Sequence, residues 1–204
     1  MSTIRSIASL AAVTFSVTAL ACKKSETPAT DTTSTAAAPA TPMADTTKPA
    51  AATTPAINDA QIAHIVVTAN SIDSTAGELA KKKGTSKSVK DFAQTMITDH
   101  AGVNKQAVAL STKLNVTPED NDTSKQLKAG ADANITKLNG LSGAAFDKAY
   151  IDNEVGYHQA VLDALDKTLI PNASNAELKA LLVKVRPAFV AHLEHAKHIQ
   201  AQLK

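Results

Sequence analysis

The 204-residue chain has one cysteine, no tryptophan and only six aromatic residues, two Tyr and four Phe. A lone cysteine cannot form an internal disulfide, so the fold must be held together by packing. The formal charge is only +2, and the lysines are spread out apart from the run at 81–83, which excludes the clustered basic face of a nucleic-acid-binding protein. There is no Gly-x-Ser-x-Gly elbow and no cysteine placed as a nucleophile, so we expect a protein that is not an enzyme.

Residues 1–21 are typical of a secretory signal peptide. Arg5 supplies a positive start, residues 7–21 are uncharged and mostly apolar, and Cys22 follows directly. The apolar stretch is shorter than the about 20 residues that a membrane-spanning helix needs. A cysteine placed after Ala19-Leu20-Ala21 resembles a bacterial lipobox, so we predict that Cys22 is lipidated and anchors the chain to a membrane. The alternative is an ordinary signal peptide with an incidental cysteine.

Residues 22–56 differ sharply in composition from the rest of the chain. Between 23 and 56 there are ten Thr, ten Ala and five Pro, with almost no large apolar side chains. Such a segment buries too little surface to offset its ordering entropy, so we expect a disordered tether. Because Lys23 and not Asp follows Cys22, general lipoprotein sorting favours the outer membrane over the inner membrane, with the domain facing the periplasm.

Residues 57–204 show apolar positions at helical spacing throughout and no strand signal. The pattern predicts an all-α domain with four long helices, at about 58–83, 86–114, 142–169 and 174–203. Asn58 and Gln61 are spaced as a capping box, and Gly84 follows the first helix where a left-handed cap is common. The connection 115–142 holds a weaker helix at 123–138 and is long enough to cross the whole bundle. This predicts a ferritin-like four-helix bundle with a helix-containing crossover between its second and third helices.

Five polar side chains fall on the apolar faces of the predicted helices. With the crossover topology they lie at similar depth, within about 6 Å along the bundle. They are Asp73, His100, Glu154, His158 and His192. Imidazoles and carboxylates converging from four helices are what a metal site in a bundle core requires, and copper, zinc and iron all suit this mixture. The alternative is a polar network, Asp73–His100–His158–Glu154, that sets the helix register without a metal. His195 is also predicted to point inward.

Several segments resemble a bacterial family known as domain of unknown function 4142, whose members are often labelled predicted outer-membrane proteins. They are Leu79-Ala80, 89–100 (VKDFAQTMITDH), 141–150 (LSGAAFDKAY), His158, and His192 with Ala196. The resemblance implies a ferritin-like bundle over most of 57–204. The chain departs from the family at Asp73, where Glu is usual, and at Tyr157, where an acid commonly precedes the second histidine.

A carboxylate-bridged di-iron centre does not fit the sequence. Ferritins that hold one use Glu-x-x-His twice, whereas Ile97 and Phe189 stand three residues before His100 and His192. Two functions therefore stay open. The first is a non-catalytic binding or interaction module of the cell envelope, with an unknown envelope partner, which the tether and the lack of catalytic motifs favour. The second is a ferritin-like metal-binding protein that uses the five core residues as ligands.

Overall fold

The computed structural model describes residues 57–203, which contain helices and no strand. The five longest helices are α1 Asp59–Lys83, α2 Lys87–Lys113, α3 Asp122–Asn139, α4 Gly143–Ala164 and α6 Ala176–Gln202. A π-helical segment, Leu165–Leu169, and the short α5, Ile170–Asn172, prolong α4. The all-α prediction is confirmed, with each long helix close to its predicted range. The predicted signal peptide, lipidated Cys22 and tether lie outside the described residues.

The two ends of α1 show how local sequence sets helix boundaries. At its start the capping box is confirmed, since Asn58 Oδ1 accepts from the Gln61 backbone N–H at 2.8 Å and the Asn58 N–H donates to Gln61 Oε1 at 3.2 Å. The left-handed cap predicted at Gly84 is wrong, because its φ is −57°. Glycine is needed at this position because the backbone passes close to the Ala80 carbonyl oxygen. A Cβ atom on Gly84 would lie 2.6 Å from that oxygen.

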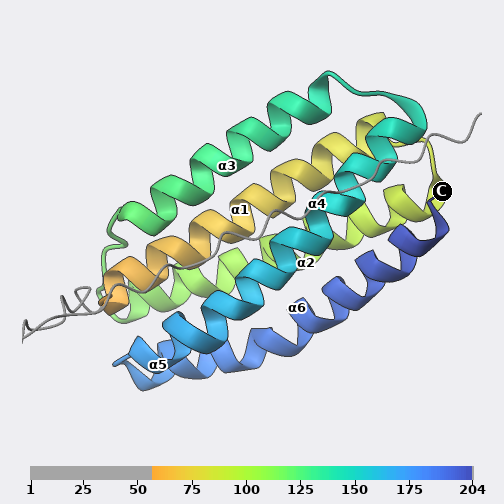
Figure 1. The fold of residues 1–204 in the computed structure, drawn as a ribbon. Helices are drawn as coiled ribbons and strands as arrows, with labels where there is room; N and C mark the ends of the chain where they lie inside the picture. The colour runs from red at the N-terminus through yellow and green to blue at the C-terminus, as the bar shows by residue number, and fades with distance from the viewer. Residues whose placement is uncertain (1–56, 204) are drawn as a thin grey trace, which may run out of the picture. The chain divides into compact units, whose positions relative to one another are not determined.

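Helix α3 carries the chain back along α1 (Figure 1). Near its start the Glu119 N–H donates to the Ala60 carbonyl at 3.0 Å, and at its end Lys83 Nζ donates to the Leu138 carbonyl at 3.0 Å. Because these contacts lie at the two ends of α1, α3 and the loop before it run alongside α1 in the same direction. The chain therefore arrives at the end of the domain that holds the α1–α2 turn before α4 begins.

Helix α4 starts at that end and α6 returns to it. The Asp147 carboxylate near the start of α4 accepts from the Ser86 N–H at 2.7 Å, which ties α4 to the α1–α2 turn. At the opposite end, the Asp59 carboxylate accepts from the N–H groups of Ser174 and Asn175 at 2.8 and 2.9 Å. Helix α4 consequently runs in the direction of α2, and α6 runs opposite to both. Asp147 serves this end contact and lies outside the polar layer.

The interior consists of two apolar clusters separated by a polar layer. The cluster at the turn end includes Phe92, Phe146 and Tyr150, and the far cluster includes Leu182 and Phe189. On α1, α2, α4 and α6, most of the buried polar residues fall between these clusters, whereas Ser111 and Asp147 lie towards the two ends. Helix α3 lies outside this arrangement and buries only Ser124 and Leu138.

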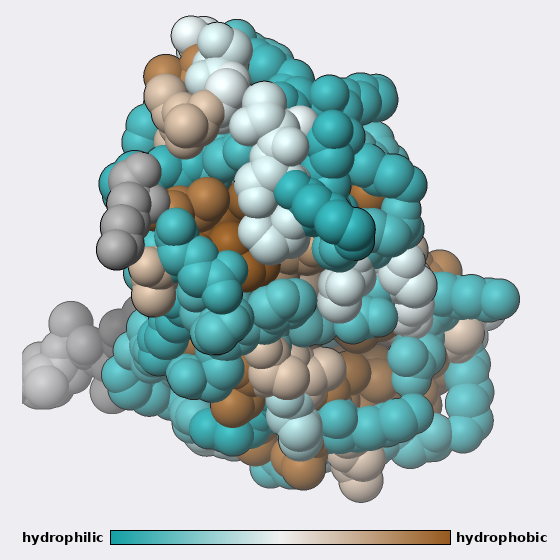
Figure 2. Space-filling model, turned by 90° about the vertical axis from the view of Figure 1, so that its right-hand side faces the viewer, coloured by the Kyte–Doolittle hydropathy of each residue, from teal (hydrophilic) through white to brown (hydrophobic). Residues whose placement is uncertain are grey.

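The surface at the turn end is mainly hydrophilic, with hydrophobic residues visible among the hydrophilic ones (Figure 2). Within residues 57–203, no helix combines the length and the apolarity that crossing a membrane requires.

Candidate metal centre

The polar layer brings the five predicted residues together from four helices. Asp73 comes from α1, His100 from α2, Glu154 and His158 from α4, and His192 from α6. None of the five is more than 6 % exposed. The helical spacing explains this convergence, because each residue lies on the apolar stripe of its helix and the antiparallel neighbours bring the stripes to the same depth.

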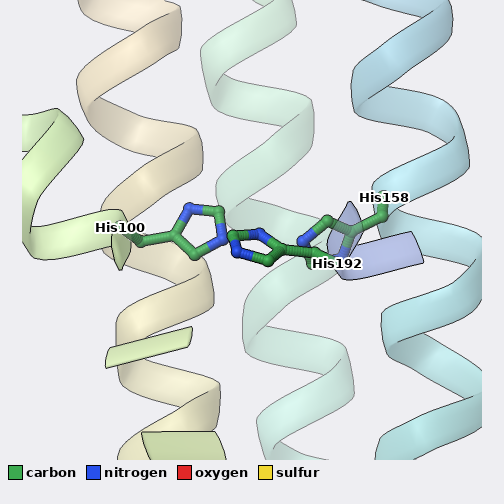
Figure 3. Close-up of side chains that lie close together, drawn as sticks. All are labelled: His100, His158 and His192. Carbon is green, nitrogen blue, oxygen red and sulfur yellow. The ribbon is translucent and has the colours of Figure 1, made fainter. Parts of the chain in front are cut away.

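The three imidazoles point toward one another across the interior (Figure 3). Their ring centroids are 5.3 to 5.6 Å apart. Asp73 Oδ2 lies 3.3 Å from His100 Nε2 and 3.5 Å from His158 Nε2. Four ligands at the usual metal–nitrogen and metal–oxygen bond lengths form a tetrahedron with edges of about 3.4 Å. The two measured separations are close to that edge.

Two of the imidazoles are oriented by oxygen acceptors on their outer nitrogen. His100 Nδ1 lies 2.8 Å from Asn70 Oδ1, and the Asn70 amide is itself oriented because its Nδ2 donates to the Val66 carbonyl at 2.7 Å. His158 Nδ1 lies 3.0 Å from the Glu154 carbonyl oxygen. An oxygen acceptor requires an N–H on the ring nitrogen that faces it, so both rings carry their lone pair on Nε2.

His192 is oriented through its Nε2 atom, whereas His100 and His158 are oriented through Nδ1. Its Nε2 lies 2.9 Å from Asp99 Oδ2, so Nε2 is the donor and Nδ1 carries the lone pair. In metal sites a histidine ligand almost always donates its second ring N–H to a carboxylate, a carbonyl or another acceptor. All three imidazoles of the layer meet this requirement.

Several buried atoms of the layer have no hydrogen-bond partner anywhere in residues 57–203. They are both carboxyl oxygens of Asp73, Glu154 Oε2, Nε2 of His100 and His158, and Nδ1 of His192. More than nine in ten buried polar groups in proteins are paired. Unpaired ligand atoms from four helices that face one another are the arrangement that a cation completes.

Two overlapping sets of side chains are close enough to share an ion. Ligand atoms of His100, His158 and His192 all lie within 4.8 Å of one another, as do those of Asp73, Glu154 and His158. His158 belongs to both sets. Asp73 and Glu154 both lie on the carboxyl side of His158 and neither is in the three-histidine set, but only Asp73 is also close to His100, at 3.3 Å from its Nε2.

Burial favours the uncharged forms of four side chains of the layer, Asp73, Glu154, His100 and His158. It raises the pKa of the Asp73 carboxyl from 3.8 to about 8, and burial together with the nearby Asp73 raises the pKa of Glu154 well above its ordinary value. Burial, helped by the neighbouring imidazoles, lowers the pKa of His100 from 6.5 to about 3. Burial and His192 lower the pKa of His158 to about 4, against the opposing effect of its bond to the Glu154 carbonyl. Neutral imidazoles are the form that binds a metal, and an ion would displace the Asp73 proton.

The outer hydrogen-bond partners were not identified from the sequence. Asn70 lies one turn before Asp73 on the same face of α1, a buried polar position of the kind that signals such a role. Asp99 is half exposed, so burial gives no such signal for it. The inward orientation predicted for His195 is wrong: it is exposed, with its ring against Phe92 at a centroid separation of 5.2 Å.

The sequence profile of one family matches residues 44–199, and its description is "Domain of unknown function (DUF4142)". This match confirms the resemblance seen in the segments around Phe92, His100 and Phe146. Comparison with curated proteins and with solved structures gives no match. Since the match covers most of the chain, the protein belongs to the DUF4142 family.

Proposed function

We propose that the domain binds one divalent transition-metal ion in its polar layer. The ligands would be Asp73 Oδ2, Nε2 of His100 and His158, and Nδ1 of His192. The observation that carries the proposal is that these buried atoms face one another without a partner in residues 57–203, while each imidazole is held by an acceptor on its other nitrogen. Three imidazoles and one carboxylate suit Zn²⁺ best, with Asp73 Oδ2 at 3.3 and 3.5 Å from Nε2 of His100 and His158, and Cu²⁺ and Fe²⁺ also accept this ligand type.

The ferritin-like bundle is part of the same proposal, without ferritin chemistry. The course of α3 along α1 and the parallel directions of α2 and α4 support that arrangement. The residues three positions before His100 and His192 are Ile97 and Phe189, and Phe189 packs its ring against His100 at 5.2 Å. Apolar residues at these two positions leave no carboxylate there to bridge a second ion. This supports a centre with one ion and mainly nitrogen ligands.

We also propose that the domain works as a lipid-anchored binding module of the cell envelope. The residues typical of a signal peptide and the lipobox-like residues before Cys22 support an anchor, and the Ala/Thr/Pro composition of 23–56 supports a tether. Cells expressing the protein should incorporate a labelled fatty acid into the wild-type chain and not into a Cys22→Ser variant. Equal labelling of both would contradict the anchor.

Metal binding is tested by measuring the ion content of the protein directly. The full chain is purified without a histidine tag and with Cys22→Ser, so that no thiol competes for the ion. After incubation with Zn²⁺ and removal of excess, mass spectrometry of the elements should find one zinc ion per chain. The bound ion should resist a weak chelator, because its ligands are buried and oriented in advance.

The matched control removes histidines outside the layer. His195 and His198 are exposed on α6, so a His195→Ala/His198→Ala double variant should bind the same single equivalent. If the wild-type chain holds no zinc, copper or iron after incubation with each, the proposed function is wrong. If binding depends on the exposed pair, the ion is a surface contaminant.

A further inference from the structure

A cavity of about 440 Å³ lies beneath α3, between that helix and the pair α1 and α4. Its inner wall includes Asp73 and Glu154, which are each 1 % exposed. Its outer wall includes Gln126, Gly130 and Gly156, which are exposed. The cavity therefore joins the protein surface to the carboxyl side of the polar layer.

Helix α3 leaves this space open through its choice of residues. A Cβ atom added to Gly130 would meet no atom within 4 Å, so neither packing nor a special backbone conformation requires glycine there. Glycine inside a helix costs about 1 kcal/mol relative to alanine. The next residue of the cavity wall, Ala131, is also small. Asn134 lines the same wall with a polar carboxamide group. The middle of α3 thus covers the layer without filling the space beside it.

Glu154 faces this cavity with an unpaired acceptor. Its Oε2 is buried and has no hydrogen-bond partner within residues 57–203, although it lies 3.5 Å from His158 Nδ1. That nitrogen already faces the Glu154 carbonyl at 3.0 Å, so it is not free to bind an ion. Glu154 is nonetheless within 4.8 Å of ligand atoms of Asp73 and His158. An ion held by Glu154 needs only a short step to reach the centre.

We infer that the cavity beneath α3 is the access passage for the ion, and that Glu154 is an intermediate binding site for a hydrated divalent cation on its way to the centre. This inference rests on the proposed metal-binding function. A divalent ion cannot shed all its water at once in a buried site, because bare charge is very costly there. Oxygen donors along the passage, the amides of Gln126 and Asn134 and then the Glu154 carboxylate, exchange for that water stepwise before the imidazoles complete the shell.

The test separates the rate of binding from the affinity. Co²⁺, whose visible absorption reports its ligands, is mixed with the metal-free full chain carrying Cys22→Ser in a stopped-flow instrument. Gly130→Leu should narrow the passage and slow both association and dissociation about tenfold, leaving Kd unchanged. The substitution should not impair folding, since leucine is a better helix former than glycine. Ala133→Leu, at an exposed position of α3 outside the cavity wall, is the matched control and should keep wild-type rates.

A second variant tests the intermediate site. Glu154→Gln should slow association about tenfold while changing Kd less than threefold, because Gln keeps the shape and, unlike Glu154, cannot lose a proton to the approaching ion and become an anionic donor. Wild-type association rates in Gly130→Leu would overturn the passage, and a large loss of affinity in Glu154→Gln would instead make Glu154 a ligand of the final centre. These failures differ from failure of the proposed function, in which the wild-type chain binds no Co²⁺ at all.

Discussion

Replacing Asp73 with Asn is expected to stabilise the metal-free domain and to lower its affinity for the ion more than a hundredfold. Asn has the size of a protonated Asp and carries two N–H donors. Nε2 of His100 and of His158 lie 3.3 and 3.5 Å from Asp73 Oδ2, and neither has a hydrogen-bond partner among residues 57–203. The new amide offers two N–H donors beside these lone pairs, where a protonated Asp73 offers one O–H and an ionised Asp73 none. The same substitution removes the only anionic ligand of the proposed tetrahedral set. Stability and function therefore change in opposite directions.

The gain in stability should increase with pH. Folding raises the pKa of Asp73 from 3.8 to about 8. The contribution of protonated Asp73 to the free energy of unfolding is therefore fully present below pH 3.8 and is lost as the pH rises towards 8. Asn does not titrate, and the difference from wild type should widen by up to about 1.4 kcal/mol per pH unit, reaching roughly 2–4 kcal/mol at pH 7. Urea denaturation of both proteins in EDTA, at pH 5 and at pH 7, measures this difference.

A second buried aspartate supplies the matched control. The Asp147 carboxylate is 2 % exposed, and it accepts from the Ser86 N–H at 2.7 Å and from the Thr85 hydroxyl at 2.6 Å. Asp147→Asn should therefore cost about 1 kcal/mol or more, because a donor replaces a needed acceptor, and should leave the ion's affinity unchanged. An Asp73→Asn protein that is less stable than wild type at pH 7 would contradict the protonated, unpaired Asp73.

Removing either His100 or His158 is expected to abolish the stabilisation that the ion provides. A hundredfold excess of Zn²⁺ over Kd should raise the Tm of the wild-type domain by roughly 5–10 °C. His100→Ala and His158→Ala each remove one of the four proposed ligands, so the loss of affinity should exceed the 10–100-fold typical of an outer hydrogen-bond partner. Differential scanning calorimetry with and without Zn²⁺ should then find no shift in Tm for either variant.

Met96→Ala distinguishes a lost ligand from a damaged core. Met96 is fully buried on α2, one turn before His100, and its truncation should cost about 2–5 kcal/mol. This variant should melt at a lower temperature and still gain the full shift with Zn²⁺. If the two histidine variants keep that shift as well, the layer is a polar network that sets the helix register and not a metal centre.

Much of the fold follows from local patterns in the chain. The capping box at Asn58 and the apolar stripes predict where the helices begin and which faces turn inward. The Gly84 prediction is wrong because the cap conformation depends on the approach of the following turn to the Ala80 carbonyl and not on glycine alone. The inward prediction for His195 is wrong because helical periodicity locates a stripe only to within about one residue, 100° of rotation, and Phe92 occupies the space beside it.

The sequence by itself determined that residues 57–203 are helical and that Asp73, His100, Glu154, His158 and His192 lie on the inward faces of their helices, because periodicity is a local property. Their similar depth depends on the course of α3 along α1, which belongs to the tertiary structure. Only the tertiary structure decided which atom of each residue is free. That choice depends on partners distant in the chain: Asn70 for His100, 30 residues away, and Asp99 for His192, 93 residues away. The cavity beside Glu154 was also decided at this level, because it depends on how far α3 lies from α4 and on side chains of three helices.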